Sequence, residues 1–311
     1  HGILRVRLGA PSRKGIRTLP ATISDLPIND LLAPIREALH RHDALVIETP
    51  PGAGKTTVVA LALLDEPWLA GRRILMLQPR RIATRNAAAR LAELLGETPG
   101  QTVGYRMRLD TRVGPGTRIE VVTEGVLRRM LADDPTLAGV GLVIFDEFHE
   151  RSLDADLSLA LALQARETFE DEAAFRIVVM SATLSGLPLH ELLDAPVLRS
   201  AGRQYPVDVR WGKPQAPRER TADRVPAVVD EALRRHPDSS VLVFLPGQGE
   251  IRRVAQALRV PPDTDIRPLY GDLPLAEQQR AIAPSPAGRR KVVLATNVAE
   301  SSLTVPAVRA V

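Results

Sequence analysis

Residues 142–149 read LVIFDEFH, in which four apolar residues run directly into two adjacent carboxylates, Asp146 and Glu147. A short apolar run of this kind predicts a strand that is buried on both faces, as in a parallel sheet. The carboxylates then stand at the carboxyl end of that strand, and α/β folds bind ligands at this edge of the sheet. The stretch therefore predicts an α/β fold with a ligand site beside Asp146 and Glu147.

A second apolar run, ALVI at 44–47, leads into a glycine-rich turn that reads TPPGAGKT at 49–56. The backbone N–H groups of such a turn, with the start of the following helix, form a cradle for phosphates. The glycines permit the turn, and Lys55 can reach the outer phosphates, although Thr49 stands where the strict pattern has glycine. The competing interpretation is a plain turn with a solvated lysine. The residues expected to hold a nucleoside triphosphate are Gly52, Ala53, Gly54, Lys55, Thr56 and Thr57.

The carboxylates would complete such a site, because hydrolysis needs a magnesium ligand and a group that positions water. Asp146 is expected to serve Mg²⁺ together with the Thr56 hydroxyl, and Glu147 is expected to act as the general base. His149 is expected to hydrogen-bond across the site and respond to the nucleotide. Alternatively, Asp146 and Glu147 cap the helix that follows, since carboxylates favour helix N-termini.

The composition limits which kinds of protein the chain can be. The chain has 311 residues, of which 44% are hydrophobic and 25% charged, as is ordinary for globular domains, and it is long enough for two. It has no cysteine, and no apolar run approaches the ~20 residues of a membrane span. We therefore expect a cytoplasmic protein without a membrane partner. The net charge of +4 resides in residues 1–25, expected to be a flexible basic extension, so charge alone does not predict nucleic-acid binding.

Alternating helical and strand-like segments predict mainly parallel sheets with right-handed crossovers. A strand is also expected through residues 205–209, inside a stretch rich in proline, arginine and glycine. We expect three parts: the extension 1–25, a first domain 26–200 and a second, partial domain 201–311. The helices of the first domain are expected at 31–40, 56–64, 82–95 and 153–167.

Five further segments follow apolar runs or open the second α/β region. They read LQPRRIA at 77–83, TEGVL at 123–127, SAT at 181–183, VLVFLPG at 241–247 and ATNVAESSLT at 295–304. In order and type, all these segments resemble the superfamily 2 helicases of the DEAH/RHA group, most of all the bacterial HrpB-type ATP-dependent helicases. The resemblance runs from Leu26 to Val311, with Phe148 where the group name has alanine. The family's final arginine-rich motif does not occur among these residues.

The resemblance implies two RecA-like domains, with ATP and Mg²⁺ between them and single-stranded RNA across both. It assigns strand contacts to Pro79, Arg80, Arg81, Thr123, Glu124 and Gly125 in the first domain and to Thr296 and Asn297 in the second. It assigns further ATP contacts to Arg90, Glu300 and Ser301, and coupling between nucleotide and strand to Ser181 and Thr183. Ordinary surface positions on a helix remain the alternative for the three arginines. DNA in place of RNA stays open, because backbone contacts dominate.

The sequence therefore favours an ATP-dependent helicase or translocase that couples hydrolysis to movement on single strands, with RNA the expected partner. A P-loop kinase for a small molecule would explain the cradle but not the SAT segment or the second-domain segments. A nucleotide-regulated RNA-binding module without turnover would also fit, because the final arginine-rich motif is absent. For the same reason we expect slow hydrolysis by this chain.

Overall fold

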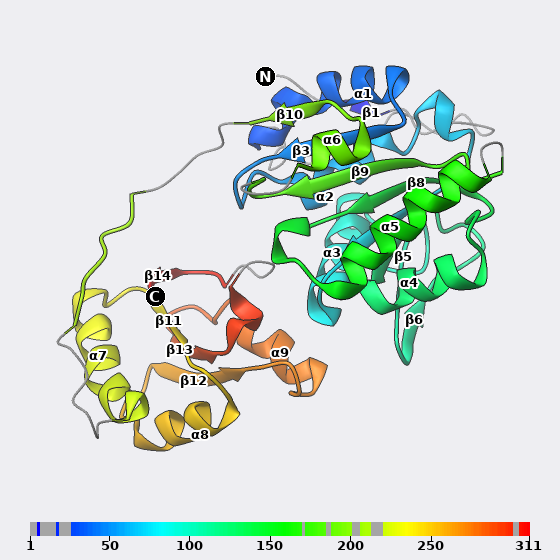
Figure 1. Ribbon diagram of the computed structural model, residues 1–311. Coiled ribbons are helices and arrows are strands. Elements are labelled where there is room, and N and C mark those ends of the chain that lie inside the picture. Colours follow the sequence, from blue (N-terminus) through cyan, green and yellow to red (C-terminus); the bar gives the residue numbers. More distant parts are fainter. Residues whose placement is uncertain are drawn as a thin grey trace. The chain divides into compact units, whose positions relative to one another are not determined.

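The computed structural model describes residues 5–6, 17–18, 26–169, 172–184, 188–200, 206–212, 220–300 and 305–311. The chain divides into two compact units, His1–Tyr205 and Pro206–Val311, drawn in Figure 1 from blue to green and from green to red. Of the expected extension 1–25, only β1 (Arg5–Val6) and its antiparallel partner β2 (Arg17–Thr18) are described. The expectation that this segment is flexible lies outside the described residues.

The first unit is built on an eight-stranded sheet with the order β10-β3-β9-β8-β4-β7-β5-β6. Every neighbouring pair is parallel except β5 and β6, which form a hairpin at one edge. The strands are β3 (Ala44–Glu48), β4 (Arg73–Gln78), β5 (Val103–Met107), β6 (Asp110–Arg112), β7 (Ile119–Thr123), β8 (Val140–Phe145), β9 (Arg176–Ser181) and β10 (Val197–Arg199).

Helices cover both faces of this sheet (Figure 1), and the alternation of side chains along each strand explains why. On β3, Leu45 and Ile47 pack with α1, α2 and α3 in one core cluster, whereas Val46 packs with α4, α5 and α6 in the other. The helical elements are η2 (Pro27–Leu31), α1 (Leu32–Arg41), α2 (Lys55–Leu63), η3 (Pro67–Leu69), α3 (Arg81–Leu94), α4 (Glu124–Asp133), η4 (Phe148–Glu150), α5 (Leu153–Thr168) and α6 (Leu189–Leu193).

The second unit carries a four-stranded parallel sheet with the order β12-β13-β11-β14. Helices cover both faces of this sheet as well. Val292 and Leu294 of β13 pack with α7 and α8 on one face, and Val293 packs with α9 on the other. Its elements are α7 (Thr221–Arg235), β11 (Ser240–Phe244), α8 (Gln248–Ala257), β12 (Thr264–Leu269), α9 (Leu275–Ile282), β13 (Arg290–Ala295), η5 (Asn297–Ala299) and β14 (Val308–Ala310). The expected α/β fold with mainly parallel sheets is confirmed.

One expected strand is absent from the described part of the chain. Residues 206–212 form no strand, and Val207 and Val209 are 83% and 63% exposed. Val207 and Val209 alternate with Pro206 and Asp208, but a strand also needs a neighbour that accepts its hydrogen bonds. Among the described residues, no helix is long and apolar enough to cross a bilayer.

Candidate nucleotide and nucleic-acid site

The sheet of the first unit brings the sequence motifs together at its carboxyl edge. Its register pairs Glu48 with Ser181, Gln78 with Thr123 and Leu77 with Phe145. Five neighbouring strands therefore end side by side, and the glycine turn, the two carboxylates and the segments at 79–81, 123–125 and 181–183 all leave the sheet there. This edge is where parallel α/β sheets bind ligands.

The glycine turn is shaped for an anion. Gly54 directly precedes α2 with φ of 90°, a conformation that strains any other residue, and a Cβ there would also press on the Leu26 side chain at 2.7 Å. Gly52 has φ of 78° but faces open space. From below, the Ile28 N–H donates to the Ala53 carbonyl over 3.1 Å. The Thr57 and Val58 N–H groups donate to the Gly54 carbonyl over 3.2 and 3.1 Å, which leaves those of Lys55 and Thr56 as the helix N–H groups available to a phosphate.

Lys55, the first residue of α2 after the glycine turn, faces Glu147, which follows β8. Lys55 is only 3% exposed, and its Nζ lies 3.3 Å from Glu147 Oε1. Burial raises the pKa of the Glu147 carboxyl to about 7, with a further rise from Asp146 that Lys55 opposes. Glu147 also adopts the left-handed backbone conformation, with φ of 51°. Non-glycine residues rarely adopt it, and such strain is common at functional sites.

Asp146 is held by three donors. The Thr56 hydroxyl donates to its Oδ2 over 2.5 Å, the Gln78 amide donates to the same oxygen over 2.7 Å, and the Glu147 N–H donates to Oδ1 over 2.9 Å. The sequence predicted Thr56 beside Asp146 but not Gln78, because nothing in the local pattern indicates a contact between residues 68 positions apart.

A hydroxyl and a carboxylate oxygen in contact are a donor set that suits Mg²⁺. Magnesium takes few protein ligands, since it keeps several waters and binds the phosphates of its nucleotide. Thr56 and Asp146 fit this pattern. A site made of protein ligands alone is not present, because the described residues contain no group of three or more His, Cys, Asp or Glu that could hold a metal.

His149 links the carboxylates to the SAT segment. Its Nδ1 accepts a hydrogen bond from the Ala182 N–H over 3.2 Å, which requires an unprotonated Nδ1. Burial, followed by the charge of Lys55, lowers the pKa of His149, so the ring is neutral and its 3.5 Å approach to Glu147 is not an ion pair. In the same segment the Ser181 hydroxyl donates to the Thr183 carbonyl, and the Ser181 carbonyl accepts from the Thr49 N–H over 3.0 Å.

The residues expected to contact a strand differ in how they are held. Arg80 precedes α3 and its Nη2 lies 3.1 Å from Glu150 Oε2, so its charge is partly neutralised. Arg81, the first residue of α3, is exposed. Glu124 begins α4, and burial, opposed by a hydrogen bond with Ser152, raises the pKa of its carboxyl.

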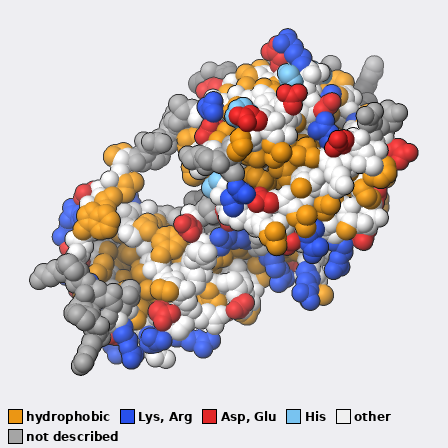
Figure 2. All heavy atoms as spheres, in the orientation of Figure 1, with side chains coloured by type: hydrophobic (Ala, Val, Ile, Leu, Met, Phe, Trp, Pro, Cys, Tyr) orange, Lys and Arg blue, Asp and Glu red, His pale blue; other side chains and the backbone are white. Residues whose placement is uncertain are grey.

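Exposed arginines also gather on one side of the first unit. Figure 2 shows Lys and Arg side chains gathered on the side of the first unit where α3, α4 and the β5–β6 hairpin lie. The exposed arginines of these elements and their connecting turns are Arg81, Arg90, Arg108, Arg112, Arg128 and Arg129. A basic patch of this kind can bind phosphates without reading sequence.

Several expected site residues are not joined to the cradle. Arg90 lies on the exposed face of α3, where its Nη1 is 2.7 Å from Glu93 of the same helix. In the second unit, Thr296 follows β13 and its N–H donates to the Leu269 carbonyl, while Asn297 and Glu300 are exposed. Ser301 lies outside the described residues. The nucleotide and strand roles of all these residues stay predictions.

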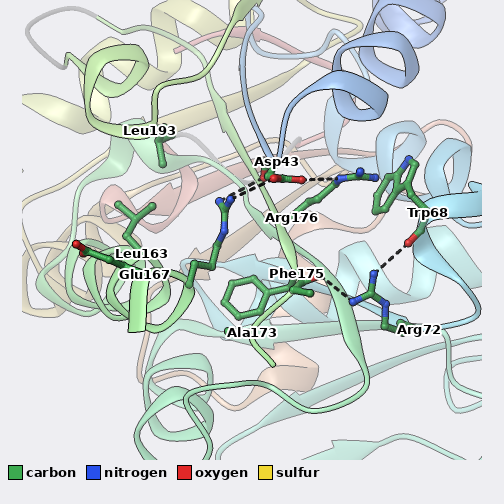
Figure 3. Close-up of a pocket in the computed structure, with 11 residues that line it drawn as sticks. Asp43, Trp68, Arg72, Leu163, Glu167, Ala173, Phe175, Arg176 and Leu193 are labelled. Atoms are coloured by element: carbon green, nitrogen blue, oxygen red, sulfur yellow. Dashed lines mark hydrogen bonds and ion pairs between the residues drawn. The ribbon is translucent and has the colours of Figure 1, made fainter. Parts of the chain in front are cut away.

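A separate cavity of the first unit lies away from this edge (Figure 3). It encloses about 600 Å³ and is lined by Asp43, Trp68, Phe175, Arg176 and Leu193, among others. Asp43 directly precedes β3 and Arg176 begins β9, so the cavity lies at the amino edge of the sheet. The Arg176 guanidinium lies over the Trp68 ring at 4.3 Å and bonds to Asp43 over 3.3 Å. None of the cradle or carboxylate residues lines it.

Comparison with known proteins accounts for both units. Residues 33–192 match the DEAD/DEAH box helicase family, and residues 224–311 match the helicase conserved C-terminal domain. The chain belongs to the DEAD/DEAH box helicase family. A helicase domain in the second unit is evidence against the P-loop kinase alternative.

Individual helicases are also similar to the chain. It is 50% identical over 292 residues to the ATP-dependent RNA helicase HrpB of Escherichia coli strain K12, covering 93% of this chain and 36% of that protein. A crystal structure of the E. coli DEAH/RHA helicase HrpB superposes with a TM-score of 0.83 at 50% identity, covering 92% of this chain and 36% of that one. A crystal structure of the E. coli DExH-box NTPase HrpB superposes with a TM-score of 0.74, also at 50% identity, covering 91% of this chain and 35% of that one. The chain thus spans about 36% of the length of the curated relative it matches.

Proposed function

We propose that this chain is the ATP-binding and strand-binding part of an ATP-dependent RNA helicase. The observation that carries the proposal is the 2.5 Å hydrogen bond from the Thr56 hydroxyl to Asp146 Oδ2. This bond joins the glycine turn to the carboxylate pair across 90 positions of sequence. A turn that binds phosphates and a carboxylate that serves magnesium are the two parts that nucleotide hydrolysis requires.

The residues of the turn and the carboxylate pair divide the chemistry between them. Lys55 supplies a point charge to the phosphates, and Thr56 with Asp146 would hold Mg²⁺, which supplies charge neutralisation when it is bound. Glu147 accepts the proton of the attacking water. A general base works best when its pKa lies near the operating pH, and the pKa of Glu147 is about 7.

Strand binding is proposed for the exposed side of the same edge. Arg81, the N-terminus of α3 and the segment 123–125 can contact the sugar-phosphate backbone, which carries no sequence information. His149 and the SAT segment would couple the two functions, because the Ala182 N–H donates to the histidine that follows the carboxylates. The similarity to an RNA helicase is what favours RNA over DNA and a cytoplasmic location.

Binding measured on the whole chain tests this proposal. A fluorescent ATP analogue should bind in a Mg²⁺-dependent manner, and labelled single-stranded RNA should bind with an affinity that falls steeply with salt. A DNA oligonucleotide of the same sequence decides the strand preference. Hydrolysis with and without RNA follows, with Glu147→Gln as the variant that keeps binding and loses turnover. Failure of the parent chain to bind nucleotide with Mg²⁺ would reject the proposal.

A further inference from the structure

Gln78 is the last residue of β4 and is only 2% exposed. Its Nε2 donates to Asp146 Oδ2 over 2.7 Å, and the backbone holds the two residues in place because the Asp146 N–H donates to the Leu77 carbonyl over 3.2 Å. The amide therefore meets the carboxylate across two neighbouring strands.

This hydrogen bond restricts how Asp146 can be used. A carboxylate offers about four lone-pair positions, two on each oxygen. Gln78 and Thr56 both donate to Oδ2, and the Glu147 N–H donates to Oδ1. Together the three donors fix the plane of the carboxylate and leave Oδ1 with room for a further partner.

Gln78 is also the residue directly before the segment Pro79-Arg80-Arg81. The residue before a proline is confined to extended backbone conformations, so Gln78 has little freedom to move independently of that segment. The segment in turn is tied to the loop after the carboxylates, through the 3.1 Å contact between Arg80 and Glu150. A displacement of residues 79–81 by a bound strand would be passed to the amide that holds Asp146.

We infer that Gln78 is a positioning residue, which holds the Asp146 carboxylate ready for magnesium and connects it to the strand-binding segment. This inference rests on the proposed function. A hydrogen bond to a group that itself binds a metal orients that group, and its loss weakens metal binding even though the ligand remains. Because coupling is reciprocal, the same bond should make strand binding sensitive to magnesium and nucleotide.

A purely structural role must be separated from a positioning role. Any buried donor that is removed leaves its acceptor unsatisfied and lowers stability. The variant Gln78→Met keeps the approximate volume without a donor. The matched control is Thr117→Val, because Thr117 is 6% exposed, lies before β7 and bonds to the Gln101 carbonyl and the Gly114 N–H, both over 2.9 Å.

The readout is the Mg²⁺ concentration that gives half-maximal binding of a fluorescent ATP analogue to the whole chain. In Gln78→Met it should rise by roughly 10-fold or more, as for other groups that orient a metal ligand. In Thr117→Val it should stay at the parent value. As a second readout, the ratio of RNA affinities with and without the Mg²⁺–analogue complex should move toward 1 in Gln78→Met.

The outcomes separate this inference from the proposed function. If the parent chain shows no Mg²⁺-dependent nucleotide binding, both are overturned. If the parent binds and a folded Gln78→Met shows the parent's Mg²⁺ dependence, the inference alone is overturned. Should circular dichroism show that Gln78→Met does not fold, Gln78→Asn replaces it, since this shorter amide cannot reach Asp146 and is expected to show the same shift.

Discussion

The carboxyl edges of the two sheets carry polar motif residues that are held in opposite ways. In the first unit, Lys55, Asp146 and Gln78 are almost fully buried. Lys55 lies 3.3 Å from Glu147, and Asp146 accepts hydrogen bonds of 2.5–2.9 Å from Thr56, Gln78 and the Glu147 N–H. In the second unit, Asn297 is exposed beyond β13, as is Glu300, and the described contacts give neither side chain a partner.

The two edges are therefore expected to contribute differently to ligand binding. Side chains that are already fixed lose little further freedom when a ligand arrives, so a preorganised edge binds more tightly. Exposed side chains must be ordered by the ligand. We therefore expect the first unit to account for most of the nucleotide affinity.

Replacing Lys55 with alanine should have the largest effect. Charge-assisted hydrogen bonds contribute about 1.5–3 kcal/mol, so the affinity for a fluorescent ATP analogue should fall roughly 10- to 100-fold. The fold should persist, because the variant also removes a buried charge. An affinity equal to that of the parent in a nucleotide titration would mean that the glycine turn is not the phosphate site.

Glu147→Gln should show how much the buried Glu147 carboxylate lowers the free energy of unfolding. The pKa of Glu147 is about 7 in the folded chain and near its ordinary 4.5 when unfolded, so between these values the folded chain binds more protons. Stability therefore falls as pH rises through this window, and above pH 7 the full penalty is present. Glutamine cannot ionise, so the variant should be more stable than the parent at pH 8 by about 1–3 kcal/mol.

Denaturant unfolding, without nucleotide or metal, checks this at two values of pH. The gain should shrink toward zero at about pH 3.5, where the parent carboxyl is largely protonated in both states. Glu172→Gln, an exposed position on the same unit, is the matched control and should show no such pH-dependent gain. A gain that is equal at both pH values would contradict the raised pKa.

The sequence predicted most of the first edge because its signals are local. A run of apolar residues that ends in a motif marks both the strand and its ligand-facing end, and the helices expected at 82–95 and 153–167 are found at Arg81–Leu94 and Leu153–Thr168. The glycine turn likewise carries its own conformational requirement, since Gly54 has a positive φ that glycine adopts without strain.

The sequence did not reveal contacts that depend on which strands become neighbours. Gln78 and Asp146 meet only because β4 lies beside β8, and Arg80 finds Glu150 for the same reason. The strand expected at 205–209 is the opposite case, because a local pattern is present there but no strand forms. Val207 and Val209 alternate correctly, yet residues 206–212 form no strand and remain exposed. Periodicity describes one strand, whereas a hydrogen-bonded ladder needs two.

Arg81→Ala and Arg80→Ala should separate a free guanidinium from a neutralised one. Each phosphate contact to a single strand contributes about 0.7 to the slope of log affinity against log salt. Arg81→Ala should lower that slope by about 0.7 and should weaken the binding of unrelated RNA sequences equally. Arg80→Ala should change the slope less, because Glu150 already shares its charge, but it should destabilise the fold more.

The control for these variants is Arg41→Ala. Arg41 ends α1 just before β3 begins, at the amino edge of the sheet, and it pairs with Glu37. Its removal should leave the salt slope of RNA binding unchanged. Losses that differ strongly between RNA sequences would point to base recognition and contradict a backbone contact at Arg81.

Asn297→Ala should give the smallest effect, and its smallness is what the contrast requires. The side chain is exposed and uncharged, so nucleotide affinity should stay within about twofold of the parent value, below 0.5 kcal/mol. RNA affinity should fall slightly, with no change in salt slope, because an amide that contacts a phosphate displaces no counterion. Glu300→Ala should likewise leave nucleotide affinity nearly unchanged. If either variant weakened nucleotide binding as much as Lys55→Ala does, the second edge would contribute to the bound state as strongly as the first. The buried network around Asp146 would then not be what determines affinity.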